Sequence, residues 1–528
     1  MSPLKFSLAA LAVASLATTS LGCEVGDPFP CVSTRTVSDR ILSRLVFFTS
    51  LSLTQGRLVQ CNSLKLVGLG SRLLFPNSTA YTEREDSFFS LNERLQPTCI
   101  FQPVDAAEVS LGLTTLLEVP ACQIAVRSGG HHHAAGSNNI HDGVTIDLVK
   151  LNSVSYDEST QTTKVGPGAQ WGDVYRYLDP MGLAVAGGRD ATVGVGGLII
   201  GGGNSFYSAR RGMVCDGVVR FEVVLGSGEI VVADTNTNAD LWVALKGGQN
   251  NFGIVTSFEL DTFETGLLWG GTVYYSLDKR QTLIGAFSDF ADKVDENTAS
   301  SSILFWSWQP SVQSTLIGTS FVNVDNVVYD EPHEEFYAIQ NLTSSMRSTN
   351  ITDLTELTDR SLPYSCVEFT FSFKNDPRVM NKVIDLHDAV VATFEQQSKD
   401  FISVAMFQPL AQSYAQQGTA RGGNVLGLDQ FQETRILSII WLQVKPELVA
   451  TARELVQGWY DEIQAFAKSV GKDSDWIYLN YAYGSQDPIA GYGKANVDKI
   501  RAAAAKYDPA GVFQTRVPGG FKVSKVSL

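Results

Sequence analysis

The stretch Arg127-Ser128-Gly129-Gly130-His131-His132-His133 follows the short apolar run 124–126. An apolar run that ends in glycines predicts a strand followed by a tight turn. Glycine accepts positive φ angles and lets a ligand approach the backbone N–H groups closely. Successive N–H groups in such a turn form a concavity that binds anions. The stretch therefore predicts a phosphate-binding turn with a histidine beside it.

Two further glycine clusters follow along the chain. They are Thr192-Val193-Gly194-Val195-Gly196-Gly197 with Gly201-Gly202-Gly203, and Lys246-Gly247-Gly248 with Asn251-Phe252-Gly253. A single cluster is more often an ordinary turn, because glycine is the commonest turn residue. Three clusters between residues 127 and 253 favour a dinucleotide ligand. A nicotinamide-binding Rossmann unit fits less well, since its fingerprint opens a helix, and no clear helix is predicted after Gly196-Gly197.

The three consecutive histidines raise the alternative of a metal site. Adjacent residues of an extended chain point to opposite faces, so only His131 and His133 share a side. Two ligands are too few for a stable zinc site. The other histidines, His141, His333 and His387, show no ligand spacing. The pattern therefore argues against a metal site and leaves His131 as a histidine directly beside the candidate phosphate loop.

The alternation of apolar runs with turns and helical stretches predicts an α+β fold. Predicted strands are Ile124–Val126, Val144–Leu148, Thr163–Val165, Val218–Val224, Glu229–Val232, Ile254–Leu260, Leu268–Tyr275, Ser302–Trp308, Leu316–Val322, Ser365–Phe373 and Ile436–Val444. Predicted helices are Gln170–Leu178, Ala239–Leu245, Arg280–Val294, Arg378–Gln397 and Pro446–Val470, with a last helix ending before Asp508-Pro509. With 528 residues, more than one lobe is expected.

The N-terminus resembles a secretory signal peptide. Lys5 precedes an apolar run over 6–19, and the small residues Ser20 and Gly22 suit cleavage before Cys23. The alternative is a buried helix of the mature fold. Secretion predicts disulfides and glycans, and the chain has seven cysteines and Asn-x-Ser/Thr sequons at Asn77, Asn341 and Asn350.

The net charge of the chain argues against nucleic acid as a partner. The net charge is −15 and the pI is about 4.9, whereas nucleic-acid binding needs clustered Lys and Arg. No second apolar run reaches the roughly 20 residues of a membrane span. Aromatic residues, 10% of the chain, are spread along it and not grouped as in a carbohydrate-binding module.

Taken in order, the motifs resemble the berberine-bridge-enzyme-like branch of the vanillyl-alcohol oxidase superfamily, in its fungal form. The matching segments are Arg127–His131, Gly143–Leu148, Val165–Ala169 with Trp171-Gly172, Val193–Gly197, Gly201–Gly203, Cys215-Asp216, Asp240–Trp242, Lys246–Gly248, Tyr478–Tyr481 and Tyr507–Phe513. The resemblance covers residues 95 to 522. No one motif is specific, but the ordered set is.

The resemblance implies a two-part FAD-binding domain with an inserted substrate domain, built on an antiparallel sheet flanked by helices. The implied boundaries are 1–22 signal peptide, 23–94 N-terminal segment, 95–262 FAD-binding domain, 263–475 substrate domain and 476–528 a C-terminal segment returning to the FAD domain. The implied cofactor residues are His131, Arg127, Ser128, Gly129, Gly130, Val193, Gly196, Gly197, Gly201, Gly202, Val255 and Asn480.

The resemblance also implies how FAD is attached and how it reacts. His131 matches the histidine that is bonded to the flavin 8α-methyl group. Asp190 stands where many relatives add a cysteine bond, so a single covalent bond is expected. Tyr478 is the leading candidate for the catalytic base, with Glu368 and Tyr481 as weaker candidates. Val193 matches the position that controls the access of dioxygen to the flavin, where valine goes with oxidase behaviour.

The function expected from this resemblance is a secreted oxidase that makes hydrogen peroxide from a small organic molecule. Its substrate would be a sugar or an alcohol of secondary metabolism. A flavin dehydrogenase with another electron acceptor and a non-catalytic secreted flavoprotein are the alternatives. Relatives also imply a disulfide between Cys61 and Cys122, and Cys23 with Cys31 is a second expected pair.

Overall fold

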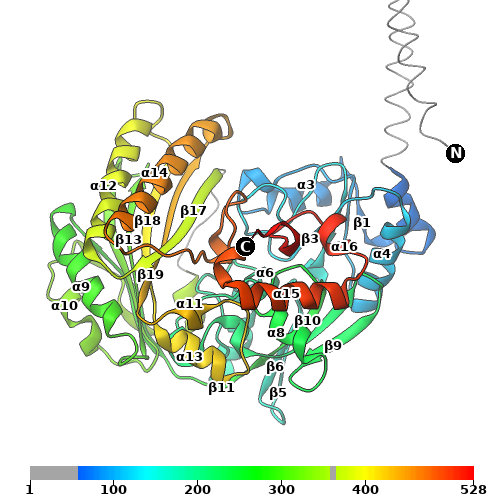
Figure 1. Cartoon of the computed structure of the whole chain (residues 1–528), viewed down its shortest axis with the longest axis horizontal. Coiled ribbons are helices and arrows are strands. Elements are labelled where there is room, and N and C mark those ends of the chain that lie inside the picture. The colour runs from blue at the N-terminus through cyan, green and yellow to red at the C-terminus, as the bar shows by residue number, and fades with distance from the viewer. Residues whose placement is uncertain (1–57, 357–363, 528) are drawn as a thin grey trace, which may run out of the picture. The chain divides into compact units, whose positions relative to one another are not determined.

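The computed structural model describes residues 58–356 and 364–527. The expected signal peptide and the expected Cys23–Cys31 pair lie outside these residues. Figure 1 shows two groups of sheets and helices, with the C-terminal helices lying against the first group. None of the described helices is long and apolar enough to cross a membrane.

The first sheet has four strands and carries the first glycine turn. Its order is β1 (Leu73–Leu74), β2 (Cys99–Phe101), β4 (Val144–Asp147) and β3 (Ile124–Arg127). Strands β2 and β3 both run parallel to β4. Helix α4 (Ala106–Glu118) begins at Asp105, whose carboxylate accepts from Glu108 N, and packs its apolar face into the core of this sheet. The turn after β3 therefore begins from a buried, parallel strand.

The second sheet has five antiparallel strands. Its order is β5 (Val154–Asp157), β6 (Thr162–Val165), β10 (Gly253–Asp261), β8 (Val218–Leu225) and β9 (Ile230–Asp234). Three helices lie in the connections between its strands, namely α5 (Trp171–Leu178), α6 (Val195–Ile200) and α8 (Ala239–Leu245). Helix α6 contains Gly196 and Gly197 and corrects the expectation that no helix follows this glycine pair. It packs on the first glycine turn through Gly196, where an added Cβ atom would come within 3.1 Å of Ser128 Oγ.

The third sheet has eight strands and lies in the second group of Figure 1. Its order is β15 (Thr343–Ser344), β12 (Leu268–Tyr275), β14 (Ser314–Asn323), β13 (Ser300–Gln309), β18 (Ile402–Leu410), β19 (Arg435–Val444) and β17 (Ser365–Lys374), with β16 (Arg347–Thr349) also paired to β12. All of these pairs are antiparallel. Strand β18 was not predicted from the sequence.

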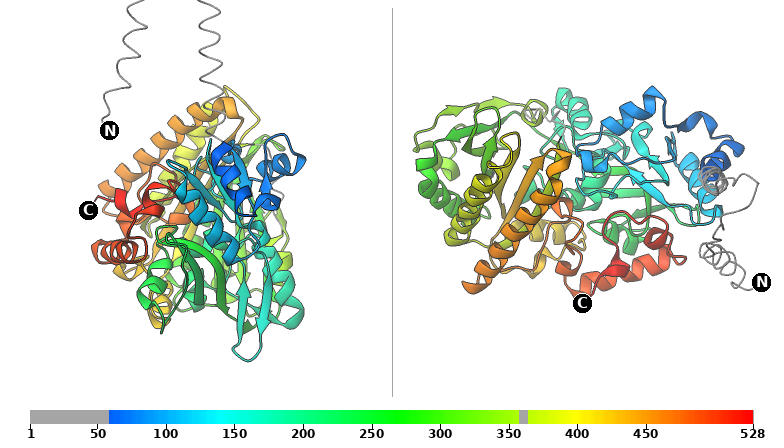
Figure 2. Two further views of the ribbon diagram at one scale, coloured as in Figure 1. Left: turned by 90° about the vertical axis from the view of Figure 1, so that its right-hand side faces the viewer. Right: turned by 90° about the horizontal axis from the view of Figure 1, so that it is seen from above.

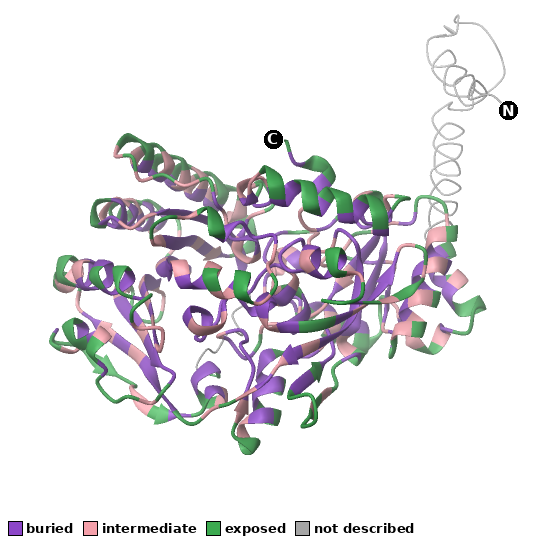
Figure 3. Ribbon diagram, turned by 60° about the horizontal axis from the view of Figure 1, so that its bottom comes forward, coloured by how far each residue is buried: buried purple, intermediate pink, exposed green. Residues whose placement is uncertain are grey.

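Helices cover one face of the eight-stranded sheet. They are α9 (Arg280–Asp292), α12 (Pro377–Phe394) and α14 (Val449–Ser469), of which α12 and α14 lie side by side (Figure 2). Phe369 and Phe371 of β17 contact Tyr460 of α14 on this face. Figure 3 shows the strands largely buried and the outer sides of the helices exposed. The opposite face carries a separate apolar cluster, described below.

The last residues return to the first sheet. After α15 (Lys494–Tyr507) and α16 (Val512–Thr515), the guanidinium of Arg516 donates to the carbonyl oxygens of Cys122 and Val119, each at 2.7 Å. Its own carbonyl oxygen accepts from Ile124 N at 2.8 Å. The C-terminal segment thereby fixes the entry to β3.

The single disulfide in the described part of the chain joins Cys61 to Cys99. Cys122 is instead a buried thiol, so the expected Cys61–Cys122 pair is wrong. Cys99 is the first residue of β2 and Cys122 lies two residues before β3, and these two strands flank β4. Their sequence context is therefore similar, and only the placement of the helix that carries Cys61 selects Cys99.

The exposed sequon asparagines lie in three separate places. Asn77 has a left-handed backbone with φ of 72°, and Asn341 lies in an exposed turn. Asn350 caps the N-terminus of α11 (Ile351–Thr355), where its side-chain oxygen accepts from Asp353 N.

Candidate flavin and substrate site

The first and second glycine turns pack backbone to backbone. A Cβ atom on Gly129 would come within 2.6 Å of Gly194 Cα, so the approach leaves no room for a side chain there. The Ser128 hydroxyl ties the turns together, since it donates to the Pro167 carbonyl at 2.6 Å and accepts from Gly196 N at 3.2 Å. Three of the predicted cofactor residues therefore form one structural unit.

This unit leaves backbone donors available. The N–H groups of Gly129 and Gly130 donate to no group in the described part of the chain. Gly130 has a φ of 74°, a conformation that favours glycine. Gly197 faces open space, because a Cβ atom built on it meets nothing within 4 Å. Unpaired N–H groups beside glycines that leave space for a ligand fit a diphosphate, as FAD contains.

Arg127 supports the first turn from behind. Its guanidinium is 1% exposed and donates to the Arg84 carbonyl at 2.7 Å and to Ser87 Oγ at 2.8 Å. It also lies over the ring of Phe88, 3.5 Å from the ring centre. Burial lowers its pKa to about 9. The Arg127 side chain thus anchors residues 84–88 beneath the glycine turn.

His131 lies at the open side of the same turn. Its half-buried ring stacks on Phe89 with 4.3 Å between ring centres, and its Nε2 lies 3.5 Å from Thr192 Oγ1. The ring therefore bridges the first and second glycine turns.

His132 and His133 stack on each other with 4.9 Å between ring centres. Burial lowers the pKa of His132 to about 4 and that of His133 well below its ordinary value, so both are neutral at pH 7. No group of three or more His, Cys, Asp or Glu in the described chain could hold a metal ion.

Asp190 shapes the turn that carries Val193. Its Oδ1 accepts from Thr192 N at 2.9 Å and from Thr192 Oγ1 at 2.7 Å, an arrangement that stabilises turns. The Val193 carbonyl accepts from Trp171 N at 3.0 Å, and its side chain is half-buried. The carboxylate at the position of the missing cysteine therefore has a structural role in this turn.

Asn480 holds the end of α6. Its Nδ2 donates to the Gly197 and Leu198 carbonyls, each at 3.2 Å, and its Oδ1 accepts from Gly203 N at 3.3 Å. A Cβ atom on Gly201 would come within 2.6 Å of this amide.

The remaining predicted cofactor residues lie at different depths. Gly202, with φ of 112°, faces Leu426. Val255 is buried in β10, opposite Val223 of β8.

Tyr478 lies deep in the core, 1% exposed, with its ring 4.7 Å from that of Tyr481 in an edge-to-face contact. Burial raises its pKa well above the ordinary value, although Arg189 acts in the opposite direction. The phenol is therefore protonated at neutral pH. A general base needs a pKa near the working pH, so burial favours a hydrogen-bonding role for Tyr478.

Glu368 projects from the face of the eight-stranded sheet that the helices leave uncovered. It pairs across the strands with Trp441, which in turn pairs with Val404. Directly paired residues of antiparallel strands share a face. The Glu368 carboxylate lies 3.6 Å from His133 Nδ1, beside the first glycine turn. This candidate base therefore joins the sheet to the cofactor residues.

One residue of the site, Arg189, was not found from the sequence. Arg189 precedes Asp190, and its Nη2 donates to Gln408 Oε1 on β18 and to the Tyr481 hydroxyl at 3.1 Å. Arg189 joins the second glycine turn, the eight-stranded sheet and the C-terminal segment in one contact. Its only signal in the sequence is a charged residue inside the glycine-rich stretch Gly187-Gly188-Arg189-Asp190.

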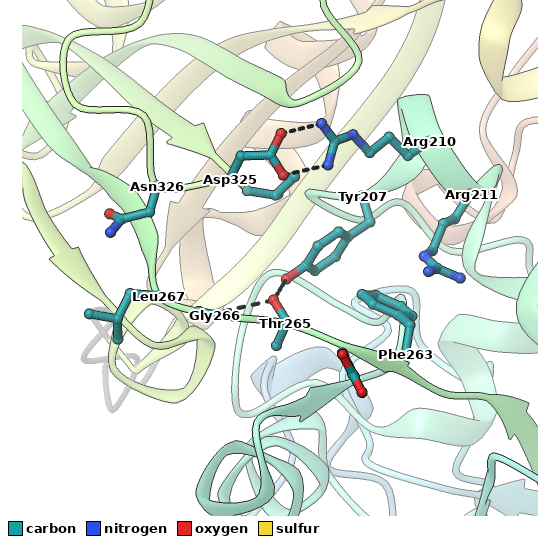
Figure 4. A pocket seen from close by; sticks show the side chains of 11 residues that line it. Tyr207, Arg210, Arg211, Phe263, Thr265, Gly266, Leu267, Asp325 and Asn326 are labelled. Atoms are coloured by element: carbon teal, nitrogen blue, oxygen red, sulfur yellow. Dashed lines mark hydrogen bonds and ion pairs between the residues drawn. The ribbon is translucent and has the colours of Figure 1, made fainter.

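A cavity of about 480 Å³ opens elsewhere, between α7 (Ser208–Arg211) and the linker from β11 (Phe263–Glu264) to β12 (Figure 4). Arg210 forms an ion pair with Asp325 across it, and the Tyr207 hydroxyl bonds Thr265 Oγ1 at 3.1 Å. Its lining contains none of the predicted cofactor residues. The glycine turns, and not this cavity, carry the groups suited to a dinucleotide.

Comparison with known proteins agrees with this assignment. A family described as "FAD binding domain" matches residues 97–234. The chain is 37% identical over 480 residues to the FAD-dependent monooxygenase drtC of Aspergillus calidoustus, covering 89% of this chain and 91% of that protein. It is 39% identical over 477 residues to the FAD-dependent monooxygenase sdcF of Emericella nidulans, covering 88% and 98%.

Solved structures share the fold at low sequence identity. The xylooligosaccharide oxidase from Myceliophthora thermophila, in complex with xylobiose, has a TM-score of 0.70 at 19% identity, covering 89% of this chain and 100% of that one. The wild-type BBE-like 1 protein of Physcomitrella patens has a TM-score of 0.69 at 17% identity, covering 87% and 98%.

Proposed function

This chain belongs to the FAD-dependent oxidoreductases with the berberine-bridge-enzyme-like fold, and we propose that it is an oxidase with FAD linked covalently to His131. In this proposal a small organic alcohol loses a hydride and a proton, and dioxygen takes up two electrons and two protons to give hydrogen peroxide. Bound FAD supplies the two-electron acceptor between the two half-reactions.

The position of His131 is the observation that carries the proposal. Its half-buried ring lies at the junction of the two glycine turns, where it stacks on Phe89 and its Nε2 lies 3.5 Å from Thr192 Oγ1. The N–H groups of Gly129 and Gly130 would hold the diphosphate next to it. Asp190 offers no thiol for a second bond. These features support a single covalent link.

The chain's own groups also support a division of roles around the substrate. Glu368 is the better base, since a carboxylate on the uncovered sheet face can accept the substrate's hydroxyl proton. Buried Tyr478 remains protonated and would donate a hydrogen bond instead. His133 stays neutral beside Glu368 and can donate a hydrogen bond to its carboxylate. In this arrangement Glu368 would take up the substrate's hydroxyl proton while the buried His133 stays neutral.

The covalent link is tested by acid precipitation of the purified protein. The yellow colour should remain in the pellet of the unmodified protein and of Asp190→Ala, and it should be lost from the pellet of His131→Ala. Asp190→Ala is the matched control because it alters the same junction without removing the attachment atom. Colour that stays entirely in the supernatant of the unmodified protein would show that the flavin is not covalently bound.

A monooxygenase is the second candidate, because the two relatives above are named FAD-dependent monooxygenases. A monooxygenase inserts one oxygen atom into its product, reduces the other to water and needs two electrons from a donor such as a reduced nicotinamide. Reaction under ¹⁸O₂ separates the two functions. The oxidase yields one peroxide per product and no label in the product, whereas the monooxygenase yields labelled product.

Two other outcomes remain distinct in the same experiment. Flavin that a substrate reduces but that air does not reoxidise would identify a dehydrogenase. Covalent flavin that no substrate bleaches in an anaerobic screen would identify a non-catalytic flavoprotein.

We also propose that the protein enters the secretory pathway with residues 1–22 removed. The disulfide between Cys61 and Cys99 supports this, since disulfides persist in oxidising compartments. N-terminal sequencing of protein secreted by a fungal host should begin at Cys23. Recovery of the intact chain inside the cells would contradict this proposal.

A further inference from the structure

The uncovered face of the eight-stranded sheet is apolar and aromatic. Ile402 and Val404 of β18 form a cluster there with Tyr364, and Phe305, Met406 and Trp441 pack against it. The last three side chains are half-buried, so part of their surface is available. Met406 and Phe305 are direct cross-strand partners, so their side chains lie side by side on this face.

The positively charged side chain of Arg189 lies at one end of this apolar surface. Gln408 lies two residues beyond Met406 on β18, on the same face. Its amide oxygen accepts from Arg189 Nη2. Two residues of a strand span about 7 Å, roughly the length of one aromatic ring with a substituent. A ring lying on Phe305 and Met406 would therefore bring its substituent to Arg189.

Arg189 has hydrogen-bonding capacity that the protein does not use. Both of its bonds use Nη2, with Gln408 and Tyr481 as neutral acceptors. Its Nε and Nη1 bond no described residue, and no carboxylate of the described chain lies within ion-pair distance of it. Neither nitrogen is sealed in the core. The adjacent carboxylate, Asp190, is engaged with Thr192.

The packing behind Arg189 holds it in this position. A Cβ atom on Gly187 would come within 2.5 Å of the Tyr175 hydroxyl, and that hydroxyl donates to the Gly188 carbonyl at 2.6 Å. The turn at Gly187 and Gly188 thus packs tightly against α5. The side chain of the next residue, Arg189, is directed toward the eight-stranded sheet. An arginine fork with free donors is suited to a planar oxyanion.

From this geometry we infer that the substrate is a planar aromatic acid, whose carboxylate or phenolate oxygen binds Arg189 while its ring lies on Phe305 and Met406. This inference rests on the proposed function, since it names the substrate of the same site. A neutral sugar would leave the guanidinium without a counter-charge. An aromatic carboxylate and a phenolate share one chemical feature, which is an oxyanion conjugated to an aromatic ring.

Binding to the flavin-loaded enzyme, measured by calorimetry, tests this inference with four probes. Benzoate is compared with benzamide for the carboxylate, and 4-cyanophenolate with 4-cyanoanisole for the phenolate. In the unmodified enzyme at least one anion should bind tenfold or more tightly than its neutral partner. The pair that shows the preference identifies which oxyanion the site takes.

Variants assign the preference to its residue. Arg189→Gln should remove it, and Arg189→Lys should keep part of it because the charge remains. Arg210→Gln is the matched control, since that arginine is paired with Asp325 at the separate cavity. Phe305→Ala should weaken the binding of acid and neutral probes to the same extent, because it removes a contact with the ring and not one with the charge.

Three results would overturn the inference. They are equal binding of acid and neutral probe, no binding of either anion, and a preference that persists in Arg189→Gln. The flavin absorbance of each variant is recorded first. Acid-selective binding with normal flavin but no peroxide would count against the proposed oxidase alone, and peroxide production without acid selectivity would count against the aromatic acid alone.

Discussion

Tyr478 illustrates how burial decides the role of a single residue. Sequence comparison makes it the leading base, yet in the structure it is 1% exposed and burial raises its pKa. An acid with a raised pKa stays protonated up to a higher pH, so Tyr478 is a donor throughout the neutral range. Under the proposed function the proton acceptor is then another group, and Glu368 is a carboxylate on the sheet face that the helices leave uncovered.

We therefore expect Tyr478→Phe to slow anaerobic flavin reduction by about tenfold, the value of one hydrogen bond. Glu368→Gln should slow it by roughly 10²- to 10⁴-fold, as loss of a general base does. Stopped-flow reduction over a range of pH measures both. The loss of rate in Glu368→Gln should exceed the loss in Tyr478→Phe. The reverse pattern would return the role of base to Tyr478.

Val193 is a second residue whose side chain carries a functional prediction. Its carbonyl is held by Trp171 N and its N–H by the Asp190 carbonyl at 3.3 Å, so the direction of its side chain is fixed. Val193→Ile adds one methyl group to a half-buried side chain, and packed interiors have few voids above the size of a water molecule. Reoxidation by air should slow tenfold or more, while reduction by substrate stays nearly unchanged.

Separate stopped-flow measurements of the two half-reactions check this prediction. Overpacking typically costs 1–3 kcal/mol of stability and would slow both half-reactions or lower the yield of folded protein. Unchanged reoxidation in a well-folded Val193→Ile protein would mean that dioxygen reaches the flavin by another route.

At the scale of elements, strand β18 shows what a sequence pattern can miss. Pro409 lies within Ile402–Leu410, and proline argues against a central strand because it cannot donate to the ladder. The structure accommodates it because β13 pairs only with residues 403–407, so Pro409 has passed the end of that partner. Among the predicted strands, none of which contains proline, Leu268–Tyr275 has the predicted bounds and the others differ by one or two residues at their ends. The missed strand carries Gln408, and the position of Arg189 was missed with it.

The disulfide is a second feature that the sequence did not predict correctly, since Cys61–Cys122 was expected and Cys61–Cys99 is found. Closing the 38-residue separation between Cys61 and Cys99 is worth about 4 kcal/mol in the chain-entropy model. We expect Cys99→Ser to lower the free energy of unfolding by about that amount. Cys122→Ser, the matched control, should cost only about 1 kcal/mol, as typical substitutions do, and should leave the disulfide intact. Denaturant unfolding with non-reducing peptide mapping measures both, and a Cys61–Cys122 peptide would refute the pairing.

At the scale of the whole molecule, the site is assembled from segments that are distant in sequence. The glycine motifs predicted the tight turns that the structure contains, because close backbone approach requires glycine itself. The hydrogen bonds of Arg127 and Asn480 could not be predicted from the sequence. Both side chains donate to backbone carbonyl oxygens that only the folded chain brings close to them. Arg189 escaped notice for the same reason, as its partners lie 219 and 292 residues away.

The C-terminal segment completes this assembly through one buried amide. Asn251 is fully buried, and its Nδ2 donates to the Gly248 carbonyl at 2.8 Å and the Phe521 carbonyl at 2.9 Å. Its Oδ1 accepts from Val523 N at 3.1 Å and from Gln514 Nε2 at 3.0 Å. The third glycine turn and the returning chain are thus joined by a single side chain whose amide has four partners.

Asn251→Leu keeps the shape of this side chain and removes all four bonds. Each buried partner left unsatisfied costs about 1–3 kcal/mol before relaxation, so we expect a loss of at least about 3 kcal/mol in the free energy of unfolding. Asn236→Leu is the control, because that side chain is exposed and surface changes stay within about 0.5 kcal/mol. Denaturant unfolding gives the stability, and limited proteolysis reports whether residues 516–527 detach. Cleavage there should accelerate in Asn251→Leu alone, because the third glycine turn is released together with the C-terminal segment. Equal stability of the two variants would show that Arg516, and not Asn251, holds the returning chain.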